Sequence, residues 1–131
     1  MKTNKNSRER IRQNKRLLNV AKALRESPDP KNFTMHSYFD VCGTPMCAFG
    51  HYAARRDLQK SFRNDPTGRW CPVDAAGNNV EAGIIDDYSI KTHFGLNVDE
   101  QFMMFSATGC NNAKSNISAA EFIEKFVKNR Q

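Results

Sequence analysis

The residue types best suited to chemistry gather between Cys42 and His51 in this 131-residue chain. Cys47 and His51 are four positions apart, so both would lie on one face of a helix, as zinc-binding pairs often do. Cys42 precedes the same helix, and either Cys71 or His36 could supply a fourth ligand. The pattern indicates a candidate structural zinc site at Cys42, Cys47, His51 and Cys71, although its spacing matches no standard zinc motif.

The same segment allows two other interpretations. Cys47 falls in the first turn of the expected helix, where free backbone N–H groups lower a thiol pKa, and His51 could serve as its base with Asp40 as the orienting acid. Alternatively, Cys42 and Cys47 are small buried residues and His51 is a core histidine bonded to a carbonyl group. Of these two, we favour the interpretation in which the three residues are buried core residues. A thiol enzyme would need its nucleophile, base and orienting group to converge on an open pocket.

Basic residues form a second group, close to the N-terminus. Residues 1–26 carry nine Lys or Arg and two Glu, a net charge of +7, whereas the remaining residues carry 11 basic and 12 acidic side chains, a net charge of −1. Such a segment can follow a nucleic-acid backbone or an acidic protein surface, or merely aid solubility. It contains no aromatic residue that could stack on a base. The candidate binding residues are Arg8, Arg10, Arg12, Lys15 and Arg16.

The helix that carries these cations is predicted from about Ser7 to Arg25. Its second half has an apolar stripe with helical spacing, formed by Leu17, Val20, Ala21 and Leu24. Upstream of Leu17 the same stripe is polar. We therefore expect the second half to dock on the core and residues 1–16 to project as a basic helical arm.

The segment with the cysteines and His51 is predicted to open a second helix. Thr44 is a good N-cap and Pro45 suits the first helical position, so a helix is expected from there to about Lys60. Residues 63–83 are rich in Gly, Pro, Asp and Asn and are predicted to form a long loop pinned by Trp70. A small β-hairpin around residues 77–79 is compatible with this composition.

Helix signals return in the C-terminal part of the chain. A helix is expected from about Ile84 to Phe94, ended by Gly95 in the C′ position. Asn97 should cap the next helix, with Glu100 completing a capping box.

The last helix is predicted from a further capping box, Ser118 with Glu121, and has an apolar face of Phe122, Ile123, Phe126 and Val127. The fold class expected from all these elements is mainly α: four or five short helices around one core, with one long loop, in a single domain of residues 1–131.

The composition also indicates the cellular compartment in which the chain is expected. No apolar run approaches the roughly 20 residues that cross a bilayer, and the basic N-terminus is not followed by the apolar stretch of a signal peptide. We therefore expect a cytoplasmic protein with no membrane partner. In such a reducing compartment the four cysteines are thiols or metal ligands and not disulfides.

Residues 42–51, CGTPMCAFGH, resemble a C-G-T-x-x-C-x-x-G-H (or W) pattern found in small uncharacterised proteins, many of them from bacteriophages. Those proteins tend to have a later F-G-L turn followed by a short helix, which looks like residues 94–96 here, with Glu100 and Phe105 after it. The resemblance covers about residues 33–106. It implies a phage or prophage origin and carries no activity.

These observations predict a non-enzymatic binding protein, phage-encoded, that modulates or inhibits a host factor or a defence complex in the host cytoplasm. One alternative is a nucleic-acid-binding module that uses the basic N-terminal helix. A second alternative is a zinc-stabilised domain or a thiol enzyme at Cys42, Cys47 and His51. No cofactor other than structural zinc is expected.

Overall fold

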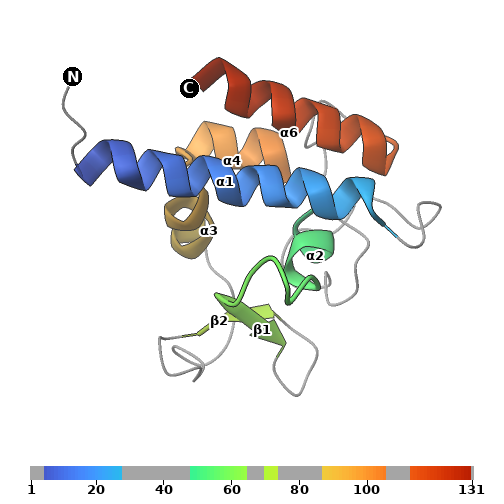
Figure 1. The fold of residues 1–131 in the computed structure, drawn as a ribbon, viewed down its shortest axis with the longest axis horizontal. Helices are drawn as coiled ribbons and strands as arrows, with labels where there is room; N and C mark the ends of the chain where they lie inside the picture. Colours follow the sequence, from blue (N-terminus) through green and yellow to red (C-terminus); the bar gives the residue numbers. More distant parts are fainter. Residues whose placement is uncertain (1–4, 28–47, 65–69, 74–86, 106–112, 131) are drawn as a thin grey trace.

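The computed structural model describes residues 5–27, 48–64, 70–73, 87–105 and 113–130, and these residues are mainly helical, as predicted (Figure 1). The helices are α1 (Lys5–Arg25), α2 (Ala48–Ala53), α3 (Asp87–Phe94), α4 (Val98–Phe105) and α6 (Asn116–Arg130). Two short strands, β1 (Phe62–Asn64) and β2 (Trp70–Pro72), lie between α2 and α3 in the sequence.

Helices α1 and α6 lie side by side and run in opposite directions (Figure 1). At one end, the Asn116 side-chain amide donates a 2.7 Å hydrogen bond to the carbonyl oxygen of Leu24. At the other end, Nε of Arg130 donates to Oδ1 of Asn14 at 2.6 Å. The start of α6 is therefore beside the end of α1, and the end of α6 is beside the middle of α1.

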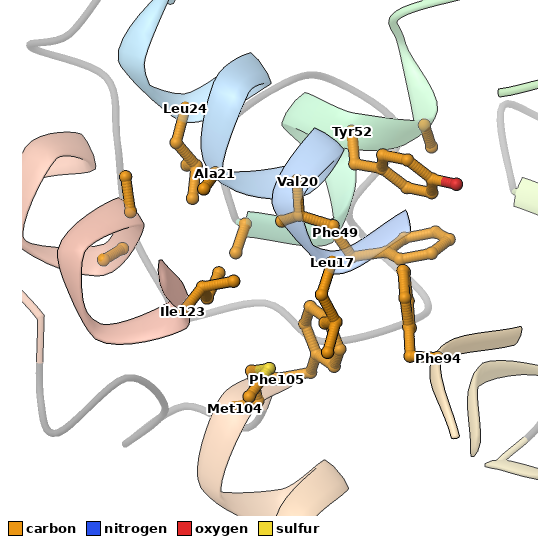
Figure 2. Close-up of a cluster of buried hydrophobic side chains, with 14 of the residues drawn as sticks. Leu17, Val20, Ala21, Leu24, Phe49, Tyr52, Phe94, Met104, Phe105 and Ile123 are labelled. Carbon is orange, nitrogen blue, oxygen red and sulfur yellow. The ribbon is translucent and has the colours of Figure 1, made fainter. Parts of the chain in front are cut away.

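The apolar face of α1 is buried as its periodicity predicts. Leu17, Val20 and Leu24 are completely buried and point toward α2, α4 and α6 (Figure 2). Aromatic rings fill the centre of the core: Phe49 meets Phe62 edge-on with ring centroids 5.2 Å apart. Burying each such side chain is worth about 1.5–3 kcal/mol, so this core is what holds α1 in place. Its further members are Tyr52, Phe94, Met104, Phe105, Ile123 and Val127.

Helix α2 is shorter than predicted. Its start at Thr44 and Pro45 lies outside the described residues, but its end is at Ala53 and not near Lys60. The buried side chain of Gln59 explains the end, because its Nε2 donates to the carbonyl oxygen of Ala53 at 2.7 Å. Its Oε1 accepts a 2.9 Å hydrogen bond from the backbone N–H of Phe62. The side chain of Gln59 thus provides hydrogen-bond partners for a backbone carbonyl group and a backbone N–H group, which a further helical turn would otherwise have provided.

The segment predicted as a long loop contains strand structure in its first part. β1 pairs antiparallel with β2 in the register Phe62↔Pro72, Arg63↔Cys71 and Asn64↔Trp70. Two three-residue strands are marginal alone. Here β1 begins with Phe62, whose side chain is buried in the core, so packing anchors the pair. The β-hairpin considered around residues 77–79 lies outside the described residues.

The predicted signals between α3 and α4 are confirmed. Gly95 has a φ of +67°, and the backbone N–H of Leu96 donates to the carbonyl oxygen of Lys91 at 2.9 Å, which is the geometry of a Schellman C-cap. Asn97 and Glu100 form the capping box, with reciprocal hydrogen bonds of 2.8 and 3.0 Å. The chain therefore reverses tightly between the two helices.

The predicted start of the last helix is wrong by one turn. Helix α6 begins at Asn116 with Ser115 as its N-cap, because the backbone N–H of Ser118 donates to the hydroxyl oxygen of Ser115 at 3.1 Å. Ser118 is thus the third helical residue and not the cap. The earlier start places Asn116 on the inward face, where it bonds to α1. The predicted apolar face is confirmed: Ile123 and Val127 are buried, and Phe122 and Phe126 pack against the core.

Candidate functional site

One face of α1 is exposed along its whole described length and combines basic with large apolar side chains. Arg8, Ile11, Lys15 and Leu18 follow the helical spacing i, i+3, i+7 and i+10, opposite the buried face, and we call them the α1 stripe. Ile11 is 64% exposed and Leu18 is 40% exposed. An isolated exposed apolar residue is ordinary, but two on one basic helical face form a recognisable surface.

Three of the five predicted cations, Arg8, Arg10 and Lys15, are exposed and form no ion pair with any residue that the structure describes. Arg12 is also exposed, but its guanidinium lies 2.6 Å from a carboxylate oxygen of Glu9, one turn earlier on the same helix. Two of these three cations, Arg8 and Lys15, are on the α1 stripe.

Arg16 faces the body of the protein, and the exposed Arg10 lies close to another cation. Arg16 is half-buried, and its Nη1 donates a 3.0 Å hydrogen bond to the carbonyl oxygen of His93 in α3. Arg10 lies near Arg130, and its charge adds to the effect of burial in lowering the pKa of Arg130 to about 10. The five cations thus do not form one continuous binding surface.

The last turn of the segment predicted to project is in contact with the body. Besides Arg16, the side-chain amide of Gln13 donates to the carbonyl oxygen of Thr92 at 3.3 Å, and Asn14 is buried against Arg130. These contacts extend the docked part of α1 one turn further toward the N-terminus than its buried apolar face, which begins at Leu17, indicates. The signal that sequence reasoning missed is polar: Gln13 and Arg16 donate to backbone carbonyl groups far along the chain.

Those acceptors are the free carbonyl groups at the end of α3. Such groups carry the negative end of the helix dipole, and cations or N–H donors stabilise them. Arg130 donates from Nη2 to Phe94 at 2.7 Å and from Nη1 to Gly95 at 2.9 Å. Its guanidinium also lies 5.1 Å from the ring centre of Phe126. Arg130 on one side and Arg16 on the other therefore fix α1 and α6 to the end of α3.

Basic residues near the C-terminal end of α1 are neutralised by carboxylates. Arg25 forms two short hydrogen bonds to Glu124 of α6, 2.7 and 2.8 Å long, and these lower the pKa of the Glu124 carboxyl group. Lys22 pairs with Glu26 at 3.8 Å. The positive potential of α1 is accordingly concentrated in its first half.

The predicted zinc site is only partly described. His51 is buried, as the core interpretation predicts, and its Nε2 lies 2.9 Å from the hydroxyl oxygen of Ser27. Cys42, Cys47 and the side chain of Cys71 lie outside the described residues. Within the described part of the chain no group of three potential ligands occurs. Zinc at these positions stays a prediction.

A buried pair of titratable residues was not predicted. The hydroxyl oxygen of Tyr52 lies 2.6 Å from Nε2 of His93, between α2 and α3. Burial, reinforced by the positive charge of Arg16, lowers the pKa of His93 to about 3, and burial raises the pKa of Tyr52. Both side chains are therefore neutral near pH 7, and the pair joins two helices without any charge in the core.

A second exposed apolar surface occurs on α4. Val98 and Phe102 are one turn apart and are 65% and 64% exposed, and Met103 beside them is 40% exposed. The carboxylate of Asp99 is on the same exposed side. We call Val98, Asp99, Phe102 and Met103 the α4 patch. The neighbouring Met104 and Phe105 are core residues.

Comparison with protein-family models, curated proteins and solved structures finds no match to this chain. Among the described residues no helix is both long and apolar enough to cross a membrane. Function must therefore be inferred from the surfaces above.

Proposed function

We propose that this chain is a non-enzymatic binding protein that recognises an acidic surface on another protein through the α1 stripe. The observation that carries the proposal is the position of Ile11, 64% exposed between Arg8 and Lys15, which form no ion pair within the described residues. Apolar anchors flanked by unpaired charges are typical of protein-binding surfaces, where the charge supplies orientation and association rate.

Nucleic acid is the weaker alternative for the same helix. Phosphates are recognised by Lys and Arg, and they offer no apolar complement to Ile11 and Leu18. Two of the five predicted cations have other partners, Arg16 in α3 and Arg12 in Glu9, so fewer charges remain to follow a phosphate backbone. These features favour an acidic protein that also presents apolar side chains.

We further propose that the partner is a host protein or a component of a defence complex, which a phage-encoded protein would bind in the host cytoplasm. Support for this part comes from the resemblance of residues 42–51 to small phage proteins, and no contact in the structure bears on it. The surface chemistry and the identity of the partner are thus separate claims and are tested by separate measurements.

The test of the surface compares two charge reversals. Lys15→Glu changes the α1 stripe, whereas Lys128→Glu makes the same charge change at an exposed position of α6 outside the stripe. Each tagged protein is used to capture partners from a host lysate, and the captured proteins are identified by mass spectrometry. We expect specific proteins that are retained by wild type and by Lys128→Glu and are lost with Lys15→Glu. Equal capture by all three would refute the role of the stripe.

Direct binding separates protein from nucleic acid. Wild type is titrated with labelled single-stranded and duplex DNA and with RNA at low and moderate salt. Binding that falls steeply with salt and is lost with Lys15→Glu and with Arg8→Glu would replace the protein partner by nucleic acid. We expect at most weak binding that Lys128→Glu weakens equally, because nonspecific attraction depends on the net charge of +6 rather than on one face.

A further inference from the structure

The α1 stripe and the α4 patch have complementary chemistry. The stripe has two exposed aliphatic side chains, Ile11 and Leu18, among cations, whereas the patch has Val98, Phe102 and Met103 beside the exposed carboxylate of Asp99. Each surface is apolar at its centre and the two carry opposite charge. Surfaces with this relationship attract each other and exclude like-charged partners.

The two surfaces cannot meet within one molecule. Leu17 of α1 and Met104 and Phe105 of α4 point into the same core, so these helices turn their buried faces toward each other (Figure 2). Their exposed faces therefore point away from the core in different directions. A contact between stripe and patch requires two copies of the chain.

We propose that the α4 patch of one copy docks on the α1 stripe of a second copy, in a head-to-tail contact. Ile11 and Leu18 are two helical turns apart, about 10 Å along the axis, and the alkyl chain of Lys15 lies between them on the same face. Phe102 packs across these side chains, and Asp99, about one turn away on its own helix, lies against the ammonium group of Lys15 or the guanidinium group of Arg8. The contact thereby gives a carboxylate partner to one of the two stripe cations, which have none among the described residues.

Symmetric contacts between like surfaces are disfavoured by charge. If two α1 stripes packed antiparallel with Ile11 opposite Leu18 of the other copy, the two Lys15 ammonium groups would face each other at the centre. Two α4 patches would likewise bring the two Asp99 carboxylates together. Like charges placed directly opposite are destabilising, so the contact between unlike surfaces is preferred.

A head-to-tail contact has a consequence for assembly. It leaves a free stripe at one end and a free patch at the other, so association continues into short chains and does not stop at a dimer unless the rotation closes a ring. Only a few large side chains take part, so the contact is weak and depends on protein concentration. An acidic partner protein would compete for the same stripe, but the self-contact does not require that partner, and each proposal can fail alone.

The test uses two variants that each remove one side of the contact. Ile11→Ser alters the stripe and leaves the patch intact, and Phe102→Ser does the reverse; both positions are exposed, so folding should be retained and is checked by circular dichroism. Sedimentation velocity is measured for each protein from dilute to concentrated solution. Moderate salt screens the repulsion caused by the net charge of +6.

We expect wild type to show an average mass that rises with concentration beyond the dimer, while each variant alone remains monomeric. An equimolar mixture of the two variants should form a complex of one copy of each and nothing larger, because only one productive contact is left. Association of either variant alone to the same extent as wild type would overturn the proposal. So would wild type that stays monomeric at the highest concentration, or a mixture that shows no complex.

Charge reversal provides an independent check. Lys15→Glu should abolish association, the double variant Lys15→Glu/Asp99→Lys should restore it, and Lys128→Glu should leave it unchanged. If the double variant does not recover while the mixture above forms its complex, Arg8 and not Lys15 pairs with Asp99, and Arg8→Glu/Asp99→Lys must then recover. Failure of both double variants would refute the charge pairing that orients the contact.

Discussion

Arg130, at the end of α6, donates a 2.7 Å hydrogen bond from Nη2 to the carbonyl oxygen of Phe94, at the end of α3. The same guanidinium reaches Gly95 and Asn14, so one side chain joins three separate parts of the fold. A cation that supplies donors to several buried acceptors contributes more to stability than one in a surface ion pair, because its loss leaves those acceptors unpaired.

Replacing this residue should therefore destabilise the protein. We expect Arg130→Ala to lower the free energy of unfolding by about 2–3 kcal/mol, measured by urea denaturation. Lys128→Ala, which removes an exposed cation from the same helical turn, should change it by less than about 0.5 kcal/mol. Arg130→Lys should recover little, because the three donors of an ammonium group are on one nitrogen and cannot replace the separate Nε, Nη1 and Nη2 donors of the planar guanidinium. Equal stability of the Ala variants would show that this contact does not hold the helices together.

Gly95 is required at its position for two distinct reasons. Its φ of +67° suits glycine, and a β-carbon there would meet the side-chain amide of Gln13. We expect Gly95→Ala to destabilise the protein by about 1–3 kcal/mol, judged by its urea midpoint. The double variant Gly95→Ala/Gln13→Ala removes the steric part and should be less destabilised than the sum of its two single variants. Strictly additive losses would mean that Gln13 moves aside at no cost.

His93 should make stability depend on pH. Its folded pKa of about 3 is below the value of about 6.5 expected in the unfolded chain, so the unfolded state binds the proton more readily. The stabilising contribution is fully present above about pH 6.5 and is lost as the pH falls toward 3, with a slope of about 1.4 kcal/mol per pH unit for one proton. Urea denaturation between pH 6.5 and 5 measures this slope.

The control for this pH effect is His93→Gln. This variant should be less stable than wild type at every pH, but its free energy of unfolding should vary less steeply with pH, by the slope that corresponds to one proton. The chosen window avoids the acids: Glu124 and Asp57 also have lowered pKa values, Asp57 to about 2 because of its hydrogen bonds to Arg55, and both act mainly at lower pH. An unchanged slope in His93→Gln would show that His93 is already protonated or exposed in the folded protein.

Metal analysis decides the zinc prediction at Cys42, Cys47, His51 and Cys71. If zinc is structural, purified protein should contain about one equivalent, and a strong chelator should lower its melting temperature. Cys47→Ser should then abolish zinc content, whereas Cys110→Ser, outside the predicted set, should retain it. Metal-free protein with a melting temperature unaffected by chelator would remove this alternative.

Local signals in the sequence were sufficient for elements that depend on neighbouring residues. The period of Leu17, Val20 and Leu24 identifies α1 and its buried face. Asn97 with Glu100, and Gly95, identify the turn between α3 and α4, since both caps are closed by atoms within a few residues. In each case the residues that cause the structure are close together in the sequence, so their pattern can be recognised.

Elements fixed by distant contacts could not be predicted in this way. The end of α2 depends on the amide of Gln59, and the start of α6 depends on the bond from Asn116 to α1, 92 residues away in the sequence. For the same reason, the sequence located only part of the candidate site. The charge run located α1, but only tertiary contacts show that Arg16 is committed to α3 and that Ile11 and Leu18 are on the exposed face.

The antiparallel pairing of α1 with α6 also matters for protein engineering. Because the last turn of α6 lies beside the middle of α1, with Asn14 bonded to Arg130, a peptide linker that spans the first half of α1 could join the two ends. New termini could then be opened elsewhere, as in a circular permutant, and the stripe on α1 would be free of any affinity tag or fusion partner.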